Sequence, residues 1–363
     1  MTTDGKSISF ALSGGGYRAT LFGLGSLWRI NDAHLLGRLD RITSVSGGSI
    51  TLGVLFRHWR ELEFADGKAR NFQDLVADPI RRFCGTTIDL PAALKGIFFP
   101  LRSPGQHLTD HFRKHLFGDF TLGELSRERY PNGPTFIFYA TNMQTGRRFR
   151  FSQDFIADYY LGVLERTDVP LPFVVAASNA FPPFLSPVVL KTDPERWTGG
   201  LLPNATPLRK RIVLTDGGIY DNLGLEALSE RVDVELVSDA GLRFRVRPSL
   251  SNLFVPQLRR VSEILVDQTR SLRRRWLIED FRTGKGGGAY WGIGTPIESY
   301  DVVNPLAKDD GVSRYLEEIP TRLSSVEPET QRALVNWGYA LCDAALRTSK
   351  ALNIQEAAGL PLP

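Results

Sequence analysis

Two kinds of hydrophobic pattern alternate over the first sixty residues of the chain. Residues 7–12 and 41–45 are short segments rich in apolar and β-branched residues, and they predict buried strands. Residues 19–35 and 48–60 carry apolar side chains every three or four positions, and they predict helices. Because strands alternate with helices over short connections, we expect an α/β fold in which helices cover a parallel sheet.

The alternation continues less regularly along the rest of the chain. Further strands are predicted at 135–141, 148–151, 184–190, 211–214 and 234–238, and further helices at 173–180, 257–278 and 328–350. Neither an internal repeat nor a low-complexity linker divides the sequence, so we expect one domain over residues 1–350. Within it we expect an insertion or cap at 61–134 and a C-terminal helical part at 241–350, followed by a loose tail at 351–363.

An uncharged stretch at residues 169–190 is long enough to cross a membrane. It contains five prolines, which would leave backbone groups unpaired in lipid, so we expect a buried helix and strand instead. The N-terminus lacks the basic and apolar regions of a signal peptide. The two cysteines, Cys84 and Cys342, form neither a disulfide framework nor a metal-site spacing, so we expect a cytoplasmic protein.

The net charge of the chain is +4, with basic clusters at 81–82, 147–148, 209–211 and 273–275. Such clusters hold anionic lipid headgroups or nucleic acid at a surface, or they are simply solvated faces. No zinc finger or other nucleic-acid motif accompanies them, so we expect no nucleic acid polymer as a partner. Residues 88–103 are the most apolar part of the expected cap, where Phe98 and Phe99 either enter a membrane, line an acyl channel or pack in the core.

Ser46 lies between the second predicted strand and the second predicted helix, in the string Ser44-Val45-Ser46-Gly47-Gly48. A serine nucleophile at such a turn strains the backbone, and small residues two positions to either side relieve the crowding. Ser44 and Gly48 are both small. The string is equally consistent with Ser46 as the N-cap of the helix.

A second glycine-rich turn, formed by Gly14, Gly15 and Gly16, joins the first strand to the first helix. Backbone N–H groups in such a turn approach a ligand closely, and the helix dipole favours negative charge. An oxyanion that forms on an attacked ester carbonyl is such a charge. Arg18 could stabilise it further, hold a phosphate or pair with a nearby carboxylate.

A dinucleotide-binding turn is an alternative for the same residues, because Gly14-x-Gly16-x-x-Ala19 fits its glycine fingerprint. That interpretation requires an acidic residue at the end of the next strand, where this chain has Ser44-Val45-Ser46. A P-loop is excluded because the Gly-Lys-Ser/Thr sequence is missing.

The histidines do not complete a common catalytic triad. The last one, His115, precedes every candidate acid late in the chain, whereas α/β-hydrolases place histidine last. His107, His111 and His115 share one helical face, which is a metal stripe only with further ligands and is otherwise a polar face. We therefore expect neither a metal nor a cofactor.

Asp216 ends a predicted strand and precedes two glycines, which allow a sharp turn that directs its carboxylate. A direct Ser–Asp pair would use this carboxylate as the general base, and burial beside an apolar pocket would raise its pKa from about 3.9. Asp221 is a second candidate base, but we interpret it as a helix cap.

Four features in this order resemble the patatin-like phospholipase family. They are Gly-Gly-Gly-x-Arg at 14–18, a serine elbow at 44–48, Ala-Ser-x-Ala-x-Pro at 177–182 and Asp-Gly-Gly at 216–218. The resemblance covers roughly residues 7–240 and implies a three-layer α/β/α fold with a mainly parallel central sheet. The family usually has glycine where this chain has Ser44 and often where it has Ala19.

The resemblance also implies a function. It implies a phospholipase A-type serine acyl hydrolase of membrane phospholipids, with Ser46 as nucleophile, Asp216 as base, oxyanion donors at Gly14, Gly15 and Gly16, and no metal. It implies association with a phospholipid membrane surface. An alternative is a membrane-binding or effector-gated module with little basal hydrolysis, which a small-molecule or protein activator switches on. The lipid headgroup, the cleaved acyl position and the oligomeric state stay open.

Overall fold

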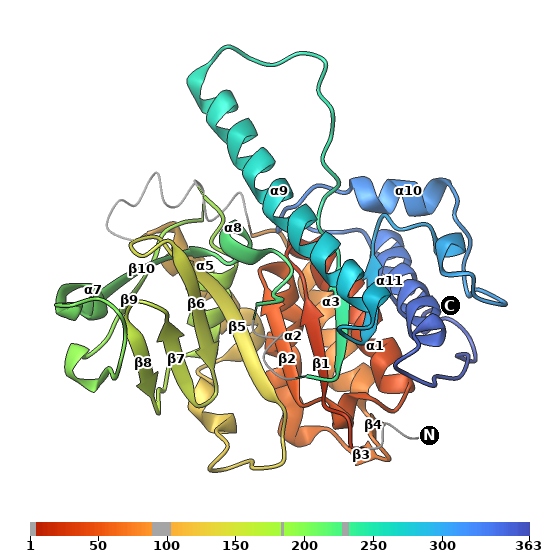
Figure 1. Ribbon diagram of the computed structural model, residues 1–363, viewed down its shortest axis with the longest axis horizontal. Coiled ribbons are helices and arrows are strands. Elements are labelled where there is room, and N and C mark those ends of the chain that lie inside the picture. Colours follow the sequence, from red (N-terminus) through yellow and green to blue (C-terminus); the bar gives the residue numbers. More distant parts are fainter. Residues whose placement is uncertain (1–4, 89–102, 183–184, 227–231) are drawn as a thin grey trace.

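The computed structural model describes residues 5–88, 103–182, 185–226 and 232–363 (Figure 1). Its main feature is a ten-stranded sheet in the order β12-β11-β1-β2-β5-β6-β7-β8, in which β10 also pairs with β5 and β9 pairs with β10. The strands are β1 (Ile8–Leu12), β2 (Arg41–Val45), β5 (Thr135–Asn142), β6 (Arg147–Ser152), β7 (Phe155–Asp158), β8 (Gly162–Glu165), β9 (Val188–Lys191), β10 (Arg211–Asp216), β11 (Val234–Asp239) and β12 (Gly288–Gly292). The run from β12 to β5 is parallel, and the pairs from β5 to β8 are antiparallel.

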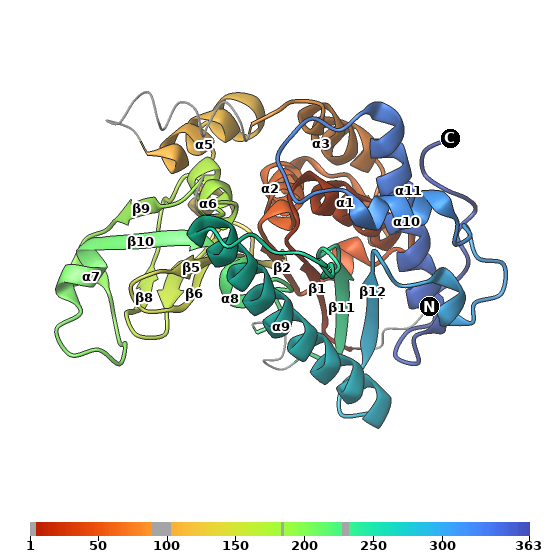
Figure 2. The same ribbon diagram turned by 90° about the horizontal axis from the view of Figure 1, so that it is seen from above.

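Helices cover both faces of this sheet (Figure 2). They are α1 (Gly16–Asp32), α2 (Gly47–His58), α3 (Asp78–Cys84), α5 (Pro104–Phe112), α6 (Leu171–Ser178), α7 (Thr206–Lys210), α8 (Gly218–Asp221), α9 (Phe254–Thr283), α10 (Gly311–Glu318) and α11 (Pro328–Thr348). In the view from above, α1, α2, α3 and α11 lie on one side of the parallel strands, and α8 and α9 lie on the other. The expected three layers and central parallel sheet are therefore present.

The largest helix contact joins α1 to α11, and glycines make it close. A Cβ on Gly25 of α1 would lie 1.9 Å from the carbonyl oxygen of Val335, and one on Gly338 of α11 would lie 2.1 Å from that of Phe22. Only glycine allows the two backbones to approach so closely. The apolar faces of both helices join the main core, so a helix from the C-terminal third completes the layer over the first strands.

The strand that carries Asp216 meets the strand that precedes Ser46 end to end. Both β2 and β10 pair with the same flank of β5, but β2 is parallel to it and β10 is antiparallel. Val45 at the end of β2 lies opposite Tyr139, and Asp216 at the end of β10 lies opposite Ala140, the next residue of β5. The carboxyl ends of the two strands therefore point at each other.

Two segments that the sequence analysis set apart contact the rest of the fold. The described part of 61–134 contributes buried side chains such as Phe72, Ile80 and Phe112 to the main core, so it packs into the helical layer. The tail at 351–363, expected to be loose, is held against the body: Arg29 donates to the carbonyl of Gln355, and Leu362 is buried. Asn336 of α11 also exchanges two hydrogen bonds with the backbone of Leu362.

The uncharged stretch at 169–190 forms α6 and β9 within the fold, as expected. Among the described helices, none is both long and apolar enough to span a bilayer. The expectation for Phe98 and Phe99 lies outside the described residues.

Candidate active site

Ser46 occupies a strained turn between β2 and α2. Its φ of 49° and ψ of −122° lie in a region that residues with a side chain rarely adopt, at a cost of about 1–3 kcal/mol. Its side chain makes no capping hydrogen bond to α2. The geometry therefore agrees with a nucleophile elbow and not with a hydroxyl that serves as a helix cap.

Small residues around Ser46 permit this turn. A Cβ on Gly48 would lie 2.5 Å from the carbonyl oxygen of Leu12, and one on Gly47 would lie 2.1 Å from that of Gly16. The elbow and the first glycine turn are thus in backbone contact. Ser44 occupies the position where the family usually has glycine. Its buried hydroxyl has a hydrogen-bond partner there, the hydroxyl of Ser49 at 2.8 Å.

The first glycine turn adopts conformations that suit glycine, with φ of 146° at Gly15 and 59° at Gly16. The N–H of Gly14 donates to the carbonyl oxygen of Asn222, at 3.0 Å. The N–H groups of Gly15 and Gly16 have no acceptor among the residues that the structure describes. They stand at the N-terminus of α1, where the helix dipole favours negative charge.

Asp216 lies beside Ser46 and is 3% exposed. Burial raises the pKa of its carboxyl from an ordinary 3.8 to about 7, while hydrogen bonds from the Gly218 N–H and the Ser46 side chain act in the opposite direction. The Gly218 N–H donates to Oδ1 at 2.7 Å and fixes the carboxylate. A carboxylate with this pKa accepts a proton near neutral pH far more readily than an ordinary aspartate.

The end of α6 holds both halves of the site together. The Ser46 N–H donates to the Ser178 hydroxyl at 2.9 Å, and the Asn179 side-chain amide donates to the Ser46 carbonyl oxygen at 2.9 Å. The carbonyl of Ala180 accepts the N–H of Asp216 at 3.0 Å. Sequence reasoning used this segment only as part of a family pattern. Its hydrogen-bonding role depends on contacts between residues that lie more than 30 positions apart along the chain.

Arg18 is fully buried and engaged with backbone on the far side of the glycine turn. Its guanidinium donates to the carbonyl of Ala240 at 2.8 and 3.0 Å, to the carbonyl of Ile319 and to the hydroxyl of Thr321. Burial is the main reason that its pKa falls to about 9. These bonds tie the segment around residue 320 to the start of α1.

The remaining sequence candidates lie as follows. Asp221 is the last residue of α8, accepts the N–H groups of Leu223, Leu225 and Glu226 in the loop that follows, and lies 3.5 Å from Arg273. His107 and His111 are on α5, and His115 is in the π-helical turn that follows it. Within the described ranges, no group of three or more potential ligands is arranged to hold a metal ion.

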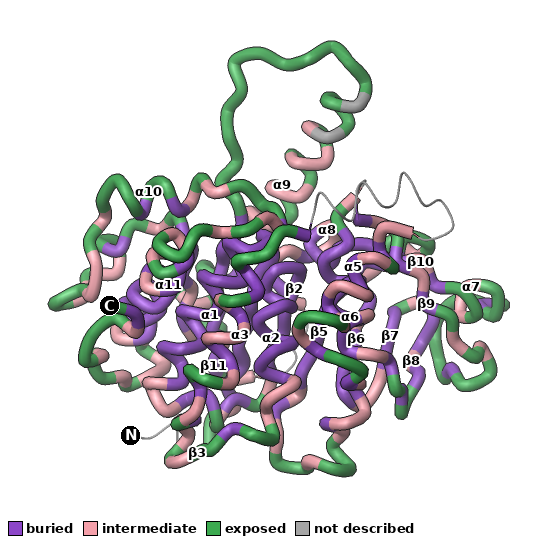
Figure 3. The backbone as a smooth tube through the Cα atoms, turned by 180° about the vertical axis from the view of Figure 1, so that it is seen from behind, coloured by how far each residue is buried: buried purple, intermediate pink, exposed green. Residues whose placement is uncertain are grey.

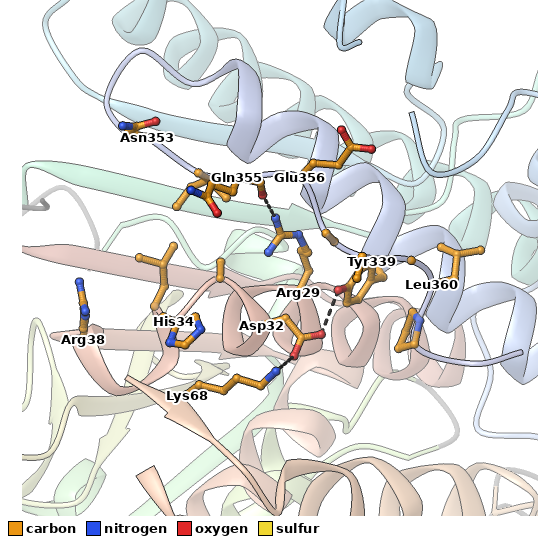
Figure 4. A pocket seen from close by; sticks show the side chains of 17 residues that line it. Arg29, Asp32, His34, Arg38, Lys68, Tyr339, Asn353, Gln355, Glu356 and Leu360 are labelled. Atoms are coloured by element: carbon orange, nitrogen blue, oxygen red, sulfur yellow. Dashed lines mark hydrogen bonds and ion pairs between the residues drawn. The ribbon is translucent and has the colours of Figure 1, made fainter. Parts of the chain in front are cut away.

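A cavity of about 570 Å³ lies at the opposite end of α1 (Figure 4). The C-terminal tail and the end of α1 line it, and a chain of contacts from Lys68 to Asp32 to Tyr339 crosses its wall. At 1.5 Å per residue, the helix separates it from the glycine turn by roughly 24 Å. Neither Ser46 nor Asp216 lines it.

The sequence matches a family model described as patatin-like phospholipase over residues 10–229, which is more than half of the chain. No curated protein matches the sequence. Solved structures match the fold over most of the chain, at low sequence identity.

Two of these structures are complexes of human GIVD cytosolic phospholipase A2. The complex with methyl gamma-linolenyl fluorophosphonate and terbium chloride is 14% identical, has a TM-score of 0.51, and is aligned over 93% of this chain and 58% of its own. The complex with methyl gamma-linolenyl fluorophosphonate is 11% identical, has a TM-score of 0.50, and is aligned over 93% of this chain and 57% of its own. The chain thus spans about three fifths of their length, and the likeness confirms the expected fold class.

Proposed function

The chain belongs to the patatin-like phospholipase family, and on this premise we propose that it is a serine hydrolase of fatty acyl esters in membrane phospholipids. The observation that carries the proposal is the meeting of the strained Ser46 with the buried Asp216 at the facing ends of β2 and β10. The N–H groups of Gly15 and Gly16, for which the described part of the chain offers no acceptor, lie next to them, because Gly47 contacts the backbone of Gly16.

In the first half of the proposed reaction, the Ser46 hydroxyl attacks the ester carbonyl carbon and its proton passes to Asp216. The oxyanion that develops on the carbonyl oxygen accepts hydrogen bonds from the N–H groups of Gly15 and Gly16, at the positive end of α1. The intermediate then expels the lysolipid alkoxide, which takes the proton from Asp216, and an acyl-Ser46 ester remains.

In the second half, water attacks the acyl-Ser46 carbonyl and transfers a proton to Asp216. Expulsion of the Ser46 oxygen, with return of that proton, releases the fatty acid and restores the free enzyme. Gly14 was expected to donate as well, but its N–H is directed at Asn222, so two donors form the proposed oxyanion hole. Arg18 supports the hole indirectly, because it holds the backbone around the start of α1.

The test is covalent labelling with a fluorophosphonate probe, a class of inhibitor that the human relative binds in its solved complex. We expect the wild type to be labelled and Ser46→Ala not to be, while Ser299→Ala, which changes an exposed serine of a 3₁₀ turn, is labelled like the wild type. Digestion of mixed phospholipids, followed by mass spectrometry, then identifies the released acids. Sustained phospholipid hydrolysis by Ser46→Ala or Asp216→Asn would contradict the proposal.

A further inference from the structure

One segment stands away from the rest of the molecule. It comprises residues 241–265, that is, the loop after β11 and the first turns of α9, and is called the projecting segment below (Figure 1). It begins just after the C-terminal end of β11, so it leaves the body at the carboxyl edge of the parallel sheet. The glycine turn lies at the same edge, because the adjacent Ser13 donates its N–H to the carbonyl oxygen of Ser238 in β11. The projecting segment and the candidate active site therefore share one edge of the molecule.

Much of the projecting segment is exposed (Figure 3). Its exposed residues include large apolar side chains on both the loop and the helix. The exposed fractions are 89% for Val246, 60% for Leu250, 71% for Leu253, 77% for Phe254, 54% for Leu258, 50% for Val261 and 61% for Leu265. Single exposed apolar residues are ordinary, but Phe254, Leu258, Val261 and Leu265 recur at helical spacing along one face of α9. A set that shares one face marks an interaction surface.

The same segment has a net positive charge as large as that of the whole chain. Residues 241–265 contain five arginines and one glutamate, so their net charge of +4 equals that of the whole chain. In the loop, arginines alternate with apolar residues from Leu242 to Arg247, and Arg243 and Arg245 are 79% and 53% exposed. An apolar surface interleaved with arginine is complementary to a layer of anionic headgroups over acyl chains.

Contacts within the segment hold it together and fix it to the site. Arg260 of α9 lies over the ring of Phe244, with 4.1 Å between the guanidinium carbon and the ring centroid, and Arg247 pairs with Glu263 at 3.1 Å. Lower on α9, Arg270 pairs with the fully buried Asp239 at 2.8 Å. The adjacent Ala240 accepts hydrogen bonds from Arg18, so the base of the segment connects to the start of α1.

We propose that the projecting segment docks this protein on an anionic phospholipid bilayer, with its apolar side chains in the interface and its arginines against lipid phosphates. The inference rests on the proposed function, because docking at this edge brings Ser46 to the lipid surface. A second copy of the chain fits less well, since two segments of charge +4 would repel each other. Apolar residues on both loop and helix also suit a fluid layer better than a single helical partner.

The test measures vesicle binding in full-length Ser46→Ala protein, so that hydrolysis does not alter the vesicles. We expect co-sedimentation with vesicles of phosphatidylcholine and phosphatidylglycerol, weaker binding to pure phosphatidylcholine, and loss of binding as salt increases. Leu253→Ser with Phe254→Ser, and separately Arg243→Gln, Arg245→Gln and Arg247→Gln together, should each lower the affinity at least about tenfold. All five side chains are at least 45% exposed, so the variants should fold.

Matched controls lie elsewhere on the surface. Leu201→Ser changes a 60% exposed leucine before α7, and Arg282→Gln changes a 72% exposed arginine at the far end of α9. Both should bind vesicles like the parent. Equal vesicle binding by the parent and both projecting-segment variants would overturn the inference. A parent protein that is a dimer, and that these variants convert to a monomer without a change in vesicle binding, would also overturn it. Because binding is measured without Ser46, a failure of the hydrolase proposal leaves this result intact.

Discussion

Ser46 and Asp216 are each held in a state that costs free energy. A serine with φ of 49° is strained, and a carboxyl with 3% exposure is poorly solvated when charged. Both states are maintained by the hydrogen bond that the Ser178 hydroxyl accepts from the Ser46 N–H and by those that Asn179 and Gly218 donate. Such local costs are characteristic of functional positions, where the strain or the altered pKa is what the chemistry uses.

The raised pKa of Asp216 predicts how activity depends on pH. If its carboxylate is the base, kcat/KM for a soluble, non-ionisable ester should rise about tenfold per pH unit up to roughly pH 7 and then level off. The reason is that only the deprotonated carboxyl accepts the Ser46 proton. A profile that is already flat at pH 5 would exclude Asp216 as the titrating base.

The same shift predicts a change in stability. Because the folded pKa of about 7 exceeds the ordinary 3.8, the folded state binds the proton more tightly, and this stabilisation is lost as pH rises from about 4 to about 7. Asp216→Asn carries no such charge and can still accept the Gly218 N–H. Its melting temperature should therefore exceed that of the wild type by an amount that grows over this window, as thermal unfolding at several pH values would reveal. A constant difference across the window would contradict the buried, shifted carboxyl.

At the scale of elements, the end of α6 aligns the ends of β2 and β10, where the two proposed reacting residues lie. Its last residue and the two that follow bond to the backbone of both Ser46 and Asp216, so a short helix with no proposed reacting group sets the distance between them. Small displacements of reacting groups cost orders of magnitude in rate. The end of α6 is thus a positioning device that sequence comparison with a family pattern does not by itself explain.

Asn179→Ala should lower kcat about 10- to 100-fold with little change in KM, because the Ser46 carbonyl loses its donor and the elbow can shift. The matched control is Asn336→Ala, which removes two hydrogen bonds between α11 and Leu362, away from the site. Steady-state kinetics on a soluble ester, with circular dichroism to verify folding, decides the outcome. An unchanged kcat in Asn179→Ala would remove the positioning role.

At the scale of the whole molecule, the fold extends beyond the matched family region. The match ends at residue 229, yet β12 extends the sheet next to β11 and α11 covers α1. Arg29 of α1 and Asp343 of α11 form a buried ion pair at 2.8 Å, with exposures of 2% and 1%. The C-terminal third is therefore part of the same core.

Removing one partner of this pair should destabilise the protein strongly. Asp343→Ala leaves the Arg29 charge buried and without its carboxylate, at an expected cost of about 3–5 kcal/mol in the free energy of unfolding. Replacing both residues, with Arg29→Met and Asp343→Leu, should recover most of that loss. Urea unfolding measures both effects, and a double variant no more stable than Asp343→Ala would contradict the pairing.

Much of the candidate site could be proposed from the sequence because its signals are local. The glycine turn, the small residues around Ser46 and the Asp216-Gly217-Gly218 turn each reflect a backbone requirement that a few neighbouring residues reveal. The helices α1, α2, α6, α9 and α11 and most strands follow from hydrophobic periodicity over a similar range, whereas the shorter helices α3, α7 and α10 were missed. The strands β7, β8 and β12 were missed.

The sequence by itself determined which residues could react and roughly where the elements begin and end, because strain and periodicity are encoded within a few positions. Only the tertiary structure decided that β10 runs against β5 and so faces β2, that Arg18 bonds to distant backbone, and that the tail packs on α1. These features depend on which distant segments pair and which side chains lose water. Such contacts join residues that are far apart along the chain, so no local pattern records them.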